Sequence, residues 1–258
     1  CWRNSIPFFV LGGGSNVLVS DRGVRGLVII NRARQVRFDI QAQPPAVWAE
    51  SGANLGLIAR QAALHGLAGL EWAAGIPGTL GGAVVGNAGA HGGDIAGNLL
   101  VAEILQPVDD MTRESGRENW SPAKLAFTYR SSLLKQQPGK VILLAALLRL
   151  EQSTPQVVQA RIDEFVAYRR RTQPPGASMG SMFKNPPGDF AGRLIEAAGL
   201  KGARQGDAQI SPLHANFFIN LGSASAADVA GLVQMARQTV AEKFNQQLEL
   251  EVQLLGEW

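Results

Sequence analysis

Two glycine-rich stretches contain the residues whose types and spacing are best suited to binding chemistry. The first, Gly12-Gly-Gly-Ser-Asn16, follows the apolar run Pro7–Leu11 and precedes Val17–Val19. A strand that ends in three glycines exposes consecutive backbone N–H groups, and a Ser-Asn pair adds two short polar side chains. This pattern predicts a concave loop that binds a pyrophosphate, with a tight hairpin turn as the alternative. The loop lacks the Gly-Lys-Ser/Thr ending of a P-loop and the glycine spacing of a Rossmann dinucleotide loop.

The second stretch, Gly75–Gly93, has small residues at almost every second position. It has neither the apolar volume nor the helical or strand period of a packed core, so something other than its own side chains must order it. Because glycine permits positive φ and a close approach of backbone N–H groups, the stretch predicts the lining of a site for a large, flat or anionic cofactor. A flexible linker is the alternative, and buried-type residues such as Ile76, Leu80 and Val84 argue against it.

The C-terminal segment Leu248–Leu254 alternates between apolar and polar residues. This period of two predicts a strand with its leucines and valine on one face and Glu249, Glu251 and Gln253 on the other. The polar face therefore carries two carboxylates, for which a solubility role at a sheet edge is the alternative to a catalytic role, and it is the better interpretation for Glu249.

Strands and helices must position these stretches. We expect strands at Pro7–Leu11, Val17–Val19, Gly26–Ile30, Ala46–Ala49 and the later part of Asp94–Pro107, and a buried strand or short helix at Val141–Leu148. We expect helices from Asn54 to about Leu64, from Thr154-Pro155 onward, over Phe190–Ala198, and from Ser225 to about Phe244, where Ser225 and Asp228 resemble a capping box.

The composition is that of an ordinary globular protein. The chain has 258 residues, of which 46% are apolar and 17% charged, which allows one large or two medium domains, and we expect two. No apolar run is long enough to span a bilayer, so no membrane insertion is expected. The single cysteine, Cys1, excludes internal disulfides and a cysteine-rich metal site, and indicates a cytoplasmic protein without a metal. The net charge of +3 suits a phosphorylated small substrate, and the basic residues do not cluster with aromatic residues as in nucleic-acid binding.

Several motifs together resemble those of the UDP-N-acetylenolpyruvoylglucosamine reductases, the MurB family of peptidoglycan synthesis. They are Leu11-Gly-Gly-Gly-Ser-Asn16, Gly75-Ile-Pro-Gly-Thr-Leu-Gly-Gly-Ala83, Gly86-Asn-Ala-Gly89, Phe127-Thr-Tyr-Arg130-Ser-Ser, Gly180-Ser-Met-Phe-Lys-Asn-Pro186, Ala198-Gly-Leu-Lys-Gly202, His214-Ala-Asn216 and Leu248-Glu-Leu-Glu251-Val. Each motif is weak alone, but their order and their spread over nearly the whole chain make the resemblance specific.

The resemblance implies an α+β fold with an FAD-binding region of the vanillyl-alcohol-oxidase (PCMH) type over residues 1–152. A smaller α+β substrate-binding domain over residues 153–258 would follow, with the last strand returning to the active site. It also implies that FAD takes a hydride from NADPH and passes it to the enolpyruvyl group of a UDP-sugar, after which the neighbouring carbon is protonated. UDP-N-acetylmuramate would be the product.

The resemblance also implies roles for individual residues. Arg130 would stabilise the charge that develops on the substrate carboxylate, Ser181 would donate the proton, and Glu251 would assist that protonation or polarise the enol. For substrate binding it implies Lys184, Asn185 and Asn216. For FAD binding it implies Gly12, Gly13, Gly14, Ser15, Asn16, Gly75, Ile76, Pro77, Gly78, Thr79, Gly81, Gly82, Ala83, Asn87, Gly89 and Tyr129.

Two features depart from the family pattern. The strand and helix that normally precede the first glycine loop are not in this sequence, so we expect part of the flavin-binding region to be missing. Thr172 follows the run Arg169-Arg-Arg171 where relatives commonly carry a lysine, and those arginines could compensate. The chain resembles the shorter of the family's two types, without a tyrosine-bearing insertion.

Three other functions compete with this interpretation. Gly176-Ala-Ser178-Met-Gly180 matches the nucleophile elbow of serine hydrolases, and Asp207 and His214 follow in the order of a catalytic triad. Prolines on both sides of this motif argue against the strand and helix that an elbow requires. Another oxidoreductase on the same flavin fold is a nearer rival, and a nucleotide-sugar binding protein without flavin is the non-enzymatic one.

Overall fold

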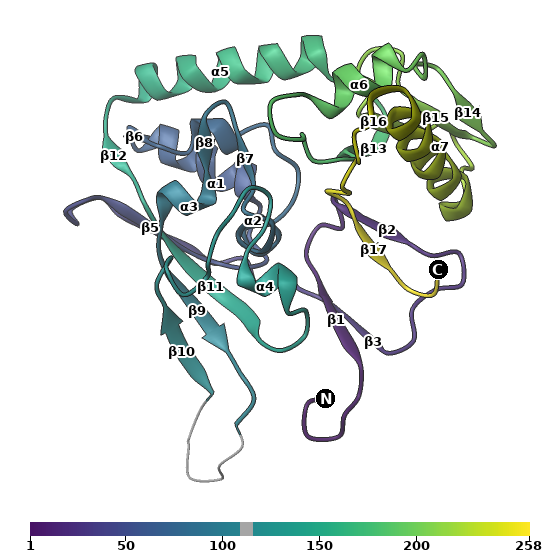
Figure 1. Ribbon diagram of the computed structural model, residues 1–258. Coiled ribbons are helices and arrows are strands. Elements are labelled where there is room, and N and C mark those ends of the chain that lie inside the picture. Colours follow the sequence, from purple (N-terminus) through teal and green to yellow (C-terminus); the bar gives the residue numbers. More distant parts are fainter. Residues whose placement is uncertain (109–115) are drawn as a thin grey trace. The chain divides into compact units, whose positions relative to one another are not determined.

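The computed structural model describes residues 1–108 and 116–258 (Figure 1). Contacts divide the chain into two compact units, each with its own hydrophobic core. Unit 1 comprises residues 1–14 and 26–167, and unit 2 comprises residues 15–25 and 168–258. The boundary expected after residue 152 precedes α5 (Pro155–Thr172), and the contacts change from unit 1 to unit 2 within this helix.

Unit 1 contains most of the strands. They are β1 (Phe8–Leu11), β3 (Leu27–Ile30), β4 (Val36–Asp39), β5 (Ala46–Glu50), β6 (Leu67–Ala68), β7 (Gly89–Ala90), β8 (Gly93–Asp94), β9 (Leu99–Leu105), β10 (Arg117–Trp120), β11 (Ile142–Arg149) and β12 (Glu151–Gln152). The helices that lie wholly within unit 1 are α1 (Leu55–Leu64), the 3-10 helix η1 (Glu71–Ala73), α2 (Leu80–Gly86), α3 (Ile95–Asn98) and α4 (Leu133–Gln136).

The main sheet of unit 1 is antiparallel, with the strand order β10-β9-β11-β5-β4. In strand β5, Val47 and Ala49 enter the core, while Trp48 between them is half-buried on the other face. Helix α1 covers this core with Leu55, Ile58 and its alanines. A separate parallel pair, β1 with β3, leads into the first glycine loop.

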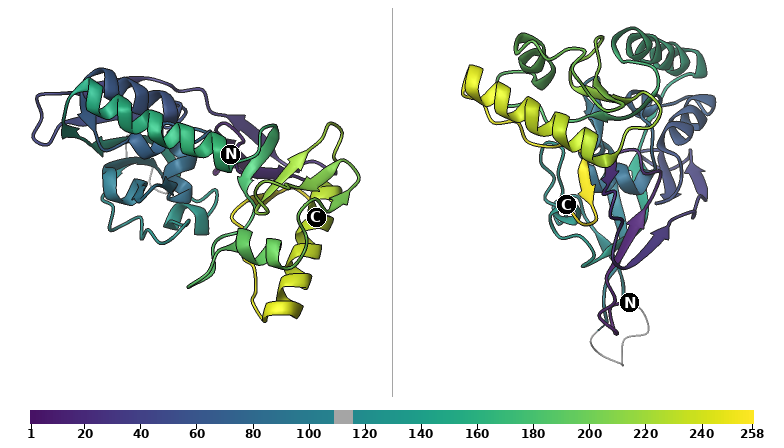
Figure 2. Two further views of the ribbon diagram at one scale, coloured as in Figure 1. Left: turned by 90° about the horizontal axis from the view of Figure 1, so that it is seen from above. Right: turned by 90° about the vertical axis from the view of Figure 1, so that its right-hand side faces the viewer.

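Unit 2 is built on the antiparallel sheet β13-β16-β15-β14. The strands are β13 (Ala177–Ser181), β14 (Arg204–Gln205), β15 (Ala208–Ile210) and β16 (Phe217–Asn220), with the separate parallel pair β2 (Val17–Val19) and β17 (Gln253–Leu255). Helices α6 (Ala191–Ala197) and α7 (Ala226–Phe244) complete the unit, and α7 packs along β14 and β15 (yellow helix and green strands in Figure 2). Asp21 accepts hydrogen bonds of 2.8 Å from the N–H groups of Ala226 and Ala227, which anchors the 15–25 segment to α7.

Most expected elements are confirmed. Asn54 caps α1, Ser225 and Asp228 form a capping box at α7, and Val141–Leu148 is largely strand β11. Within the described part of the chain, no helix is both long and apolar enough to cross a bilayer.

One expected strand is wrong in part. Leu248 and Val252 are buried as predicted, but Leu254 is 44% exposed and Leu255 is buried instead. The chain bends at Val252, and only Gln253–Leu255 forms a regular strand, because the pairing partner changes to β2 at this point. Pairing with β2 therefore decides which residues of this segment are buried, instead of the alternation of apolar and polar residues in the sequence.

Candidate active site

The first glycine loop and the start of the second glycine stretch pack against each other in unit 1. A Cβ atom on Gly12 would overlap the Thr79 side chain, and one on Gly13 would lie 3.3 Å from the Cα of Gly78. Gly14 has a φ of 66°, in the left-handed region that favours glycine. The two loops therefore present main chain rather than side chains at this place.

The segment after β5 joins the same arrangement. The N–H groups of Leu80 and Gly81 donate to the carbonyl oxygens of Ala53 and Ser51 at 2.8 and 2.7 Å. A Cβ on Gly81 would lie 2.9 Å from that Ser51 oxygen, so the close approach requires glycine. The Ser51 hydroxyl and Asn31 Nδ2 are 2.8 Å apart, which ties the end of β3 to this segment. Sequence reasoning missed Ser51 and Asn31, and a polar residue directly after each strand was the available signal.

Part of the second glycine stretch is helical, contrary to expectation. Helix α2 (Leu80–Gly86) begins after Thr79, whose hydroxyl accepts a 3.4 Å hydrogen bond from the N–H of Gly82. Leu80 and Val84 are completely buried, one helical turn apart. A cap and two buried anchors thus suffice for a short helix that its glycines alone would disfavour.

Asn87 ends α2 and links it to two other segments. It has a φ of 44° and is buried, and its Nδ2 donates to the carbonyl of Thr128 at 3.0 Å. Its Oδ1 accepts from the N–H of Ala96, also at 3.0 Å. Expected as a cofactor ligand, Asn87 has both ends of its side-chain amide hydrogen-bonded to main chain, which positions the segment before Arg130.

The remaining glycines form the hairpin β7–β8. His91 and Gly92, with φ of 52° and 84°, make its two-residue turn. The His91 ring stacks on Phe165 of α5, with centroids 4.1 Å apart, and Trp72 covers Gly93 so closely that a Cβ there would overlap the indole. The stretch is ordered by these contacts, which excludes a flexible linker.

Arg130 lies at the tip of a tight turn in unit 1. The flanking residues Thr128 and Ser131 exchange backbone hydrogen bonds of 3.0 and 3.1 Å, with Tyr129 and Arg130 between them. Arg130 has a φ of 55°, a conformation that costs a residue with a Cβ about 1–2 kcal/mol. Such strain persists only where the surroundings hold it in place.

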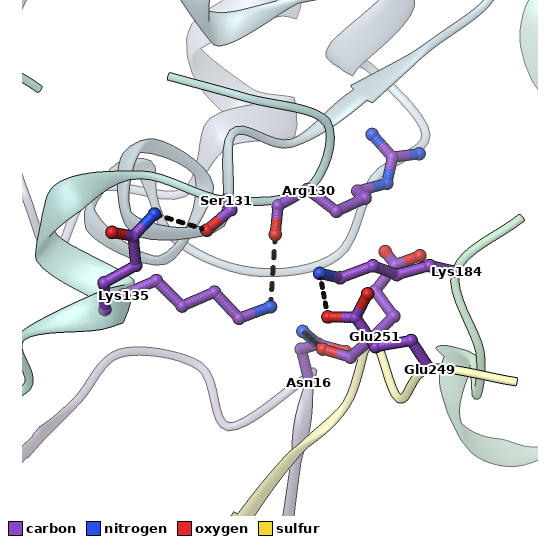
Figure 3. A network of polar contacts seen from close by, with 8 residues as sticks. Asn16, Arg130, Ser131, Lys135, Lys184, Glu249 and Glu251 are labelled. Atoms are coloured by element: carbon purple, nitrogen blue, oxygen red, sulfur yellow. Dashed lines mark hydrogen bonds and ion pairs between the residues drawn. The ribbon is translucent and has the colours of Figure 1, made fainter. Parts of the chain in front are cut away.

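Three groups hold the Arg130 turn. Lys135 Nζ donates to the Arg130 carbonyl at 3.2 Å (Figure 3). Arg130 Nη2 donates to the carbonyl of Gly89 at 2.7 Å. The guanidinium carbon also lies 5.2 Å from the centroid of the ring of Tyr129, a residue that is 53% exposed. The arginine is therefore fixed at both its backbone and its guanidinium.

In unit 2, Ser181 lies at the end of β13 beside an irregularity of the sheet. Ser178 pairs with Ile219 and Ser181 with Phe217, and the register shifts between these pairs. Gly180, with a φ of 75°, absorbs this shift. The irregularity therefore sets the direction in which the Ser181 side chain leaves the strand.

The residues after Ser181 pair with the segment that carries the two carboxylates. The N–H of Lys184 donates to the Glu249 carbonyl at 2.8 Å, and the N–H of Glu251 donates to the Met182 carbonyl at 2.9 Å. Lys184 Nζ forms an ion pair with the Glu249 carboxylate, and Glu251 lies two residues further along (Figure 3). Asn16 Nδ2 donates to the Glu251 carbonyl at 3.2 Å, so this end of the first loop belongs to unit 2.

The two predicted asparagines have different surroundings. Asn185 is exposed, and its Oδ1 accepts from the N–H of Ala191 at the start of α6. Asn216 is buried, and its side-chain amide bonds both peptide groups of Phe183, at 2.9 Å to the N–H and 2.8 Å to the carbonyl. Only Asn185 is exposed as a substrate ligand should be.

Two family models match the chain. The FAD binding domain matches residues 1–112, and the UDP-N-acetylenolpyruvoylglucosamine reductase C-terminal domain matches residues 172–255. The chain is 46% identical to such a reductase of Chloroflexus aggregans over 97% of its own length and 83% of the relative's. It is 45% identical to that of Rubrobacter xylanophilus, over 99% and 82%. The chain belongs to the UDP-N-acetylenolpyruvoylglucosamine reductase family.

A solved member of this reductase family has the same fold. The structure of MurB from Thermus caldophilus is 38% identical, and the match covers 97% of this chain and 86% of that one with a TM-score of 0.81. The predicted α+β fold with an FAD-binding region and a second domain is therefore confirmed.

Membership of the reductase family excludes the serine hydrolase alternative, and the positions of Ser178, Asp207 and His214 also contradict it. Ser178 lies within strand β13 instead of at a strand-to-helix elbow. Asp207 accepts from the N–H of Ser223, while His214 Nδ1 accepts from the N–H of Asn216. The three residues thus have separate partners, and the Gly-x-Ser-x-Gly match is accidental.

Thr172, at the position where we expect a lysine in relatives, lies in the last turn of α5. The Thr172 hydroxyl donates to the Tyr168 carbonyl at 2.9 Å, as a helix-internal hydrogen bond. Of the three arginines before it, Arg169 is half-buried, and burial lowers its pKa, while Arg170 and Arg171 are exposed. Arg169 is thus the one of the three whose guanidinium is partly shielded from water.

Proposed function

We propose that this chain reduces the enolpyruvyl group of UDP-N-acetylglucosamine enolpyruvate to give UDP-N-acetylmuramate, with NADPH as reductant and FAD as cofactor. The observation that carries the proposal is that all three candidate catalytic residues stand on segments ordered by their own hydrogen bonds, in a chain of this reductase family. The single cysteine supports a reducing compartment, so we place the reaction in the cytoplasm.

The glycine loops of unit 1 fit the phosphates of FAD. Gly12 and Gly13 stand where a Cβ would press on Thr79 or on the main chain of Gly78, so the first loop can bring its backbone N–H groups close to an anion. Gly81 lets the second stretch pack against Ser51 beside this loop. Exposed Tyr129 and the small residues of the second stretch would flank the rings. When bound, FAD carries the hydride from NADPH to the substrate.

Arg130 supports the charge that hydride addition creates. Addition to the enolpyruvyl double bond moves negative charge onto the substrate carboxylate, and a guanidinium can bind that carboxylate through two parallel hydrogen bonds. Because Gly89 and Lys135 already hold this turn, little reorganisation is needed in the transition state. A preorganised donor of this kind lowers a barrier by about 3 kcal/mol.

Ser181 is the proton donor in this proposal. A serine hydroxyl is a weak acid, so it needs a neighbouring cation and the exclusion of water to give up its proton to the carbanion. Lys184 follows three residues later, with its side chain only 16% exposed. Glu251, whose backbone pairs with Met182, would assist by holding the proton network in place.

Lys184 and Asn185 would bind the diphosphate or the sugar. An ammonium beside an exposed amide suits phosphate oxygens and sugar hydroxyls. The ion pair with Glu249, whose side chain is 72% exposed, is weak enough to be exchanged for a phosphate.

A single anaerobic titration tests the proposal. Purified protein is loaded with FAD and its absorption followed during addition of NADPH and then of the enolpyruvyl UDP-sugar. Bleaching by NADPH and recovery on adding the sugar are expected. Recovery only with oxygen would favour a related flavin oxidase, and failure to bind FAD would favour a nucleotide-sugar binding protein.

A further inference from the structure

The backbone of Phe183 is bonded on both sides, although the regular sheet ends before it. On one side, residues 182 and 184 pair with residues 249 and 251, with Phe183 opposite Leu250. In this pairing the N–H and carbonyl of Phe183 itself point to the other side. There the side chain of Asn216 accepts from the N–H at 2.9 Å and donates to the carbonyl at 2.8 Å.

Asn216 thus replaces the next strand of a sheet. Its own carbonyl adds a 2.8 Å hydrogen bond from the N–H of Met182. Both residues are almost completely inaccessible to solvent, Phe183 at 1% and Asn216 at 3% exposed. Buried peptide groups need partners, and here one asparagine side chain supplies both for Phe183.

His214 fixes Asn216 in turn. Its Nδ1 accepts a 3.2 Å hydrogen bond from the N–H of Asn216, and its ring packs on Phe217 with centroids 4.8 Å apart. A chain of contacts therefore runs from His214 through Asn216 to the segment between Ser181 and Lys184.

We propose that Asn216 is a positioning residue that aims Ser181 and Lys184 by holding the Phe183 peptide groups, and that it does not contact the UDP-sugar. The proposal rests on the proposed function for the roles of Ser181 and Lys184. It assigns Asn216 a role different from the substrate-binding role expected from sequence, because its amide oxygen and nitrogen are both already bonded in the interior.

Three variants test this proposal. Asn216→Ala removes both side-chain hydrogen bonds to Phe183, while Asn216→Asp keeps an acceptor for the N–H and loses the donor for the carbonyl. Asn220→Ala, at the end of strand β16 that directly follows Asn216, is the control. The Oδ1 of Asn220 also accepts two backbone hydrogen bonds, from Gly222 and Ala224, but none from the segment after Ser181.

Amide hydrogen exchange and anaerobic stopped-flow kinetics supply the readouts. In Asn216→Ala the Phe183 amide should exchange faster, and flavin reoxidation by the enolpyruvyl sugar should slow by about 10- to 100-fold, because small misplacements of reacting groups have effects of this size. Flavin reduction by NADPH should remain unchanged, and the Kd for UDP should change less than the rate of reoxidation. In Asn216→Asp the Phe183 amide should stay protected while reoxidation slows, which keeps the test valid if Asn216→Ala does not fold.

The proposal is overturned if Asn216→Ala leaves Phe183 exchange unchanged, or if the loss lies in the Kd for UDP with the saturated rate intact. An equal loss in Asn220→Ala would also overturn it, since the effect would then be general destabilisation. If wild-type flavin is not reoxidised by the sugar, the proposed function fails, while the exchange of Phe183 still tests the contact with Asn216.

Discussion

The glycine loops of unit 1 and the Ser181–Lys184 segment of unit 2 are built on opposite principles. In the loops, close packing of main chain excludes side chains, as Gly13 against Gly78 and Gly81 against Ser51 show. In the Ser181–Lys184 segment, the backbone is bonded on both sides so that the side chains can project in fixed directions. The first arrangement suits a cofactor bound through N–H groups, and the second suits acid catalysis by a single hydroxyl.

The comparison also explains which changes each region should tolerate. Adding a methyl group to a loop glycine meets main chain that cannot move away, whereas removing a polar group from unit 2 leaves a buried partner unsatisfied. Arg130 combines features of the two regions. Its backbone has the positive φ that favours glycine, and its side chain is held in place by a hydrogen bond to the Gly89 carbonyl.

The largest effect should follow removal of the Ser181 hydroxyl. Ser181→Ala should slow flavin reoxidation by the enolpyruvyl sugar by about 10²- to 10⁴-fold, the range for loss of a general acid. Flavin reduction by NADPH should be unaffected, as measured by stopped-flow absorbance. Ser178→Ala on the same strand is the matched control, since Ser178 is exposed and three residues away. Equal loss of both half-reactions would remove Ser181 from the role of acid.

A variant of Arg130 tests whether a side chain of unit 1 contributes as much to flavin reoxidation as Ser181 of unit 2. Arg130→Lys keeps the charge but loses the planar fork, and reoxidation should slow by about 10²- to 10³-fold, as for loss of a preorganised donor. The measurement is the same stopped-flow experiment with FAD content checked first. Reoxidation at the wild-type rate would exclude this arginine from the site.

A glycine pair probes the cofactor loops directly. Gly81→Val should lower the free energy of unfolding by about 1–3 kcal/mol through overpacking and should abolish FAD binding. Gly86→Ala is the control in the same helix, because a Cβ at Gly86 would have no heavy atom of another part of the chain within 4 Å. This variant should retain FAD and be at least as stable as the wild type. Thermal unfolding and the flavin content of purified protein check both. If Gly81→Val retains flavin, the close packing at Ser51 is not required for the cofactor.

The smallest effect concerns pH and unit 2. Burial, with a further contribution from Lys201, lowers the pKa of His214 below its usual 6.5, although its own backbone hydrogen bond and Glu196 oppose this. Below about pH 6.5 the unfolded chain therefore binds a proton at His214 that the folded chain does not bind. As the pH is lowered, the free energy of unfolding decreases until the folded His214 is also protonated. Tm of the wild type should fall a few degrees more than that of His214→Gln between pH 7 and 5. Parallel curves in differential scanning calorimetry would contradict this.

Local sequence determined much of this protein. The capped helices α1 and α7, the buried strand β11 and the motif set of the reductase family could all be predicted, because caps, hydrophobic periods and short motifs act over a few residues. The glycine stretches were correctly predicted to be ordered segments instead of a linker.

The rest was decided by contacts between distant residues. The glycine stretch contains α2 because Leu80 and Val84 find a core, and the strand predicted over Leu248–Leu254 breaks because its partner changes to β2. The inward hydrogen bonds of Asn87 and Asn216 could not be predicted from the sequence, since an asparagine in a motif looks the same whether it faces a ligand or a peptide group. Only the tertiary structure decides this, because the partner of a hydrogen bond is set by the fold and not by the neighbours in sequence.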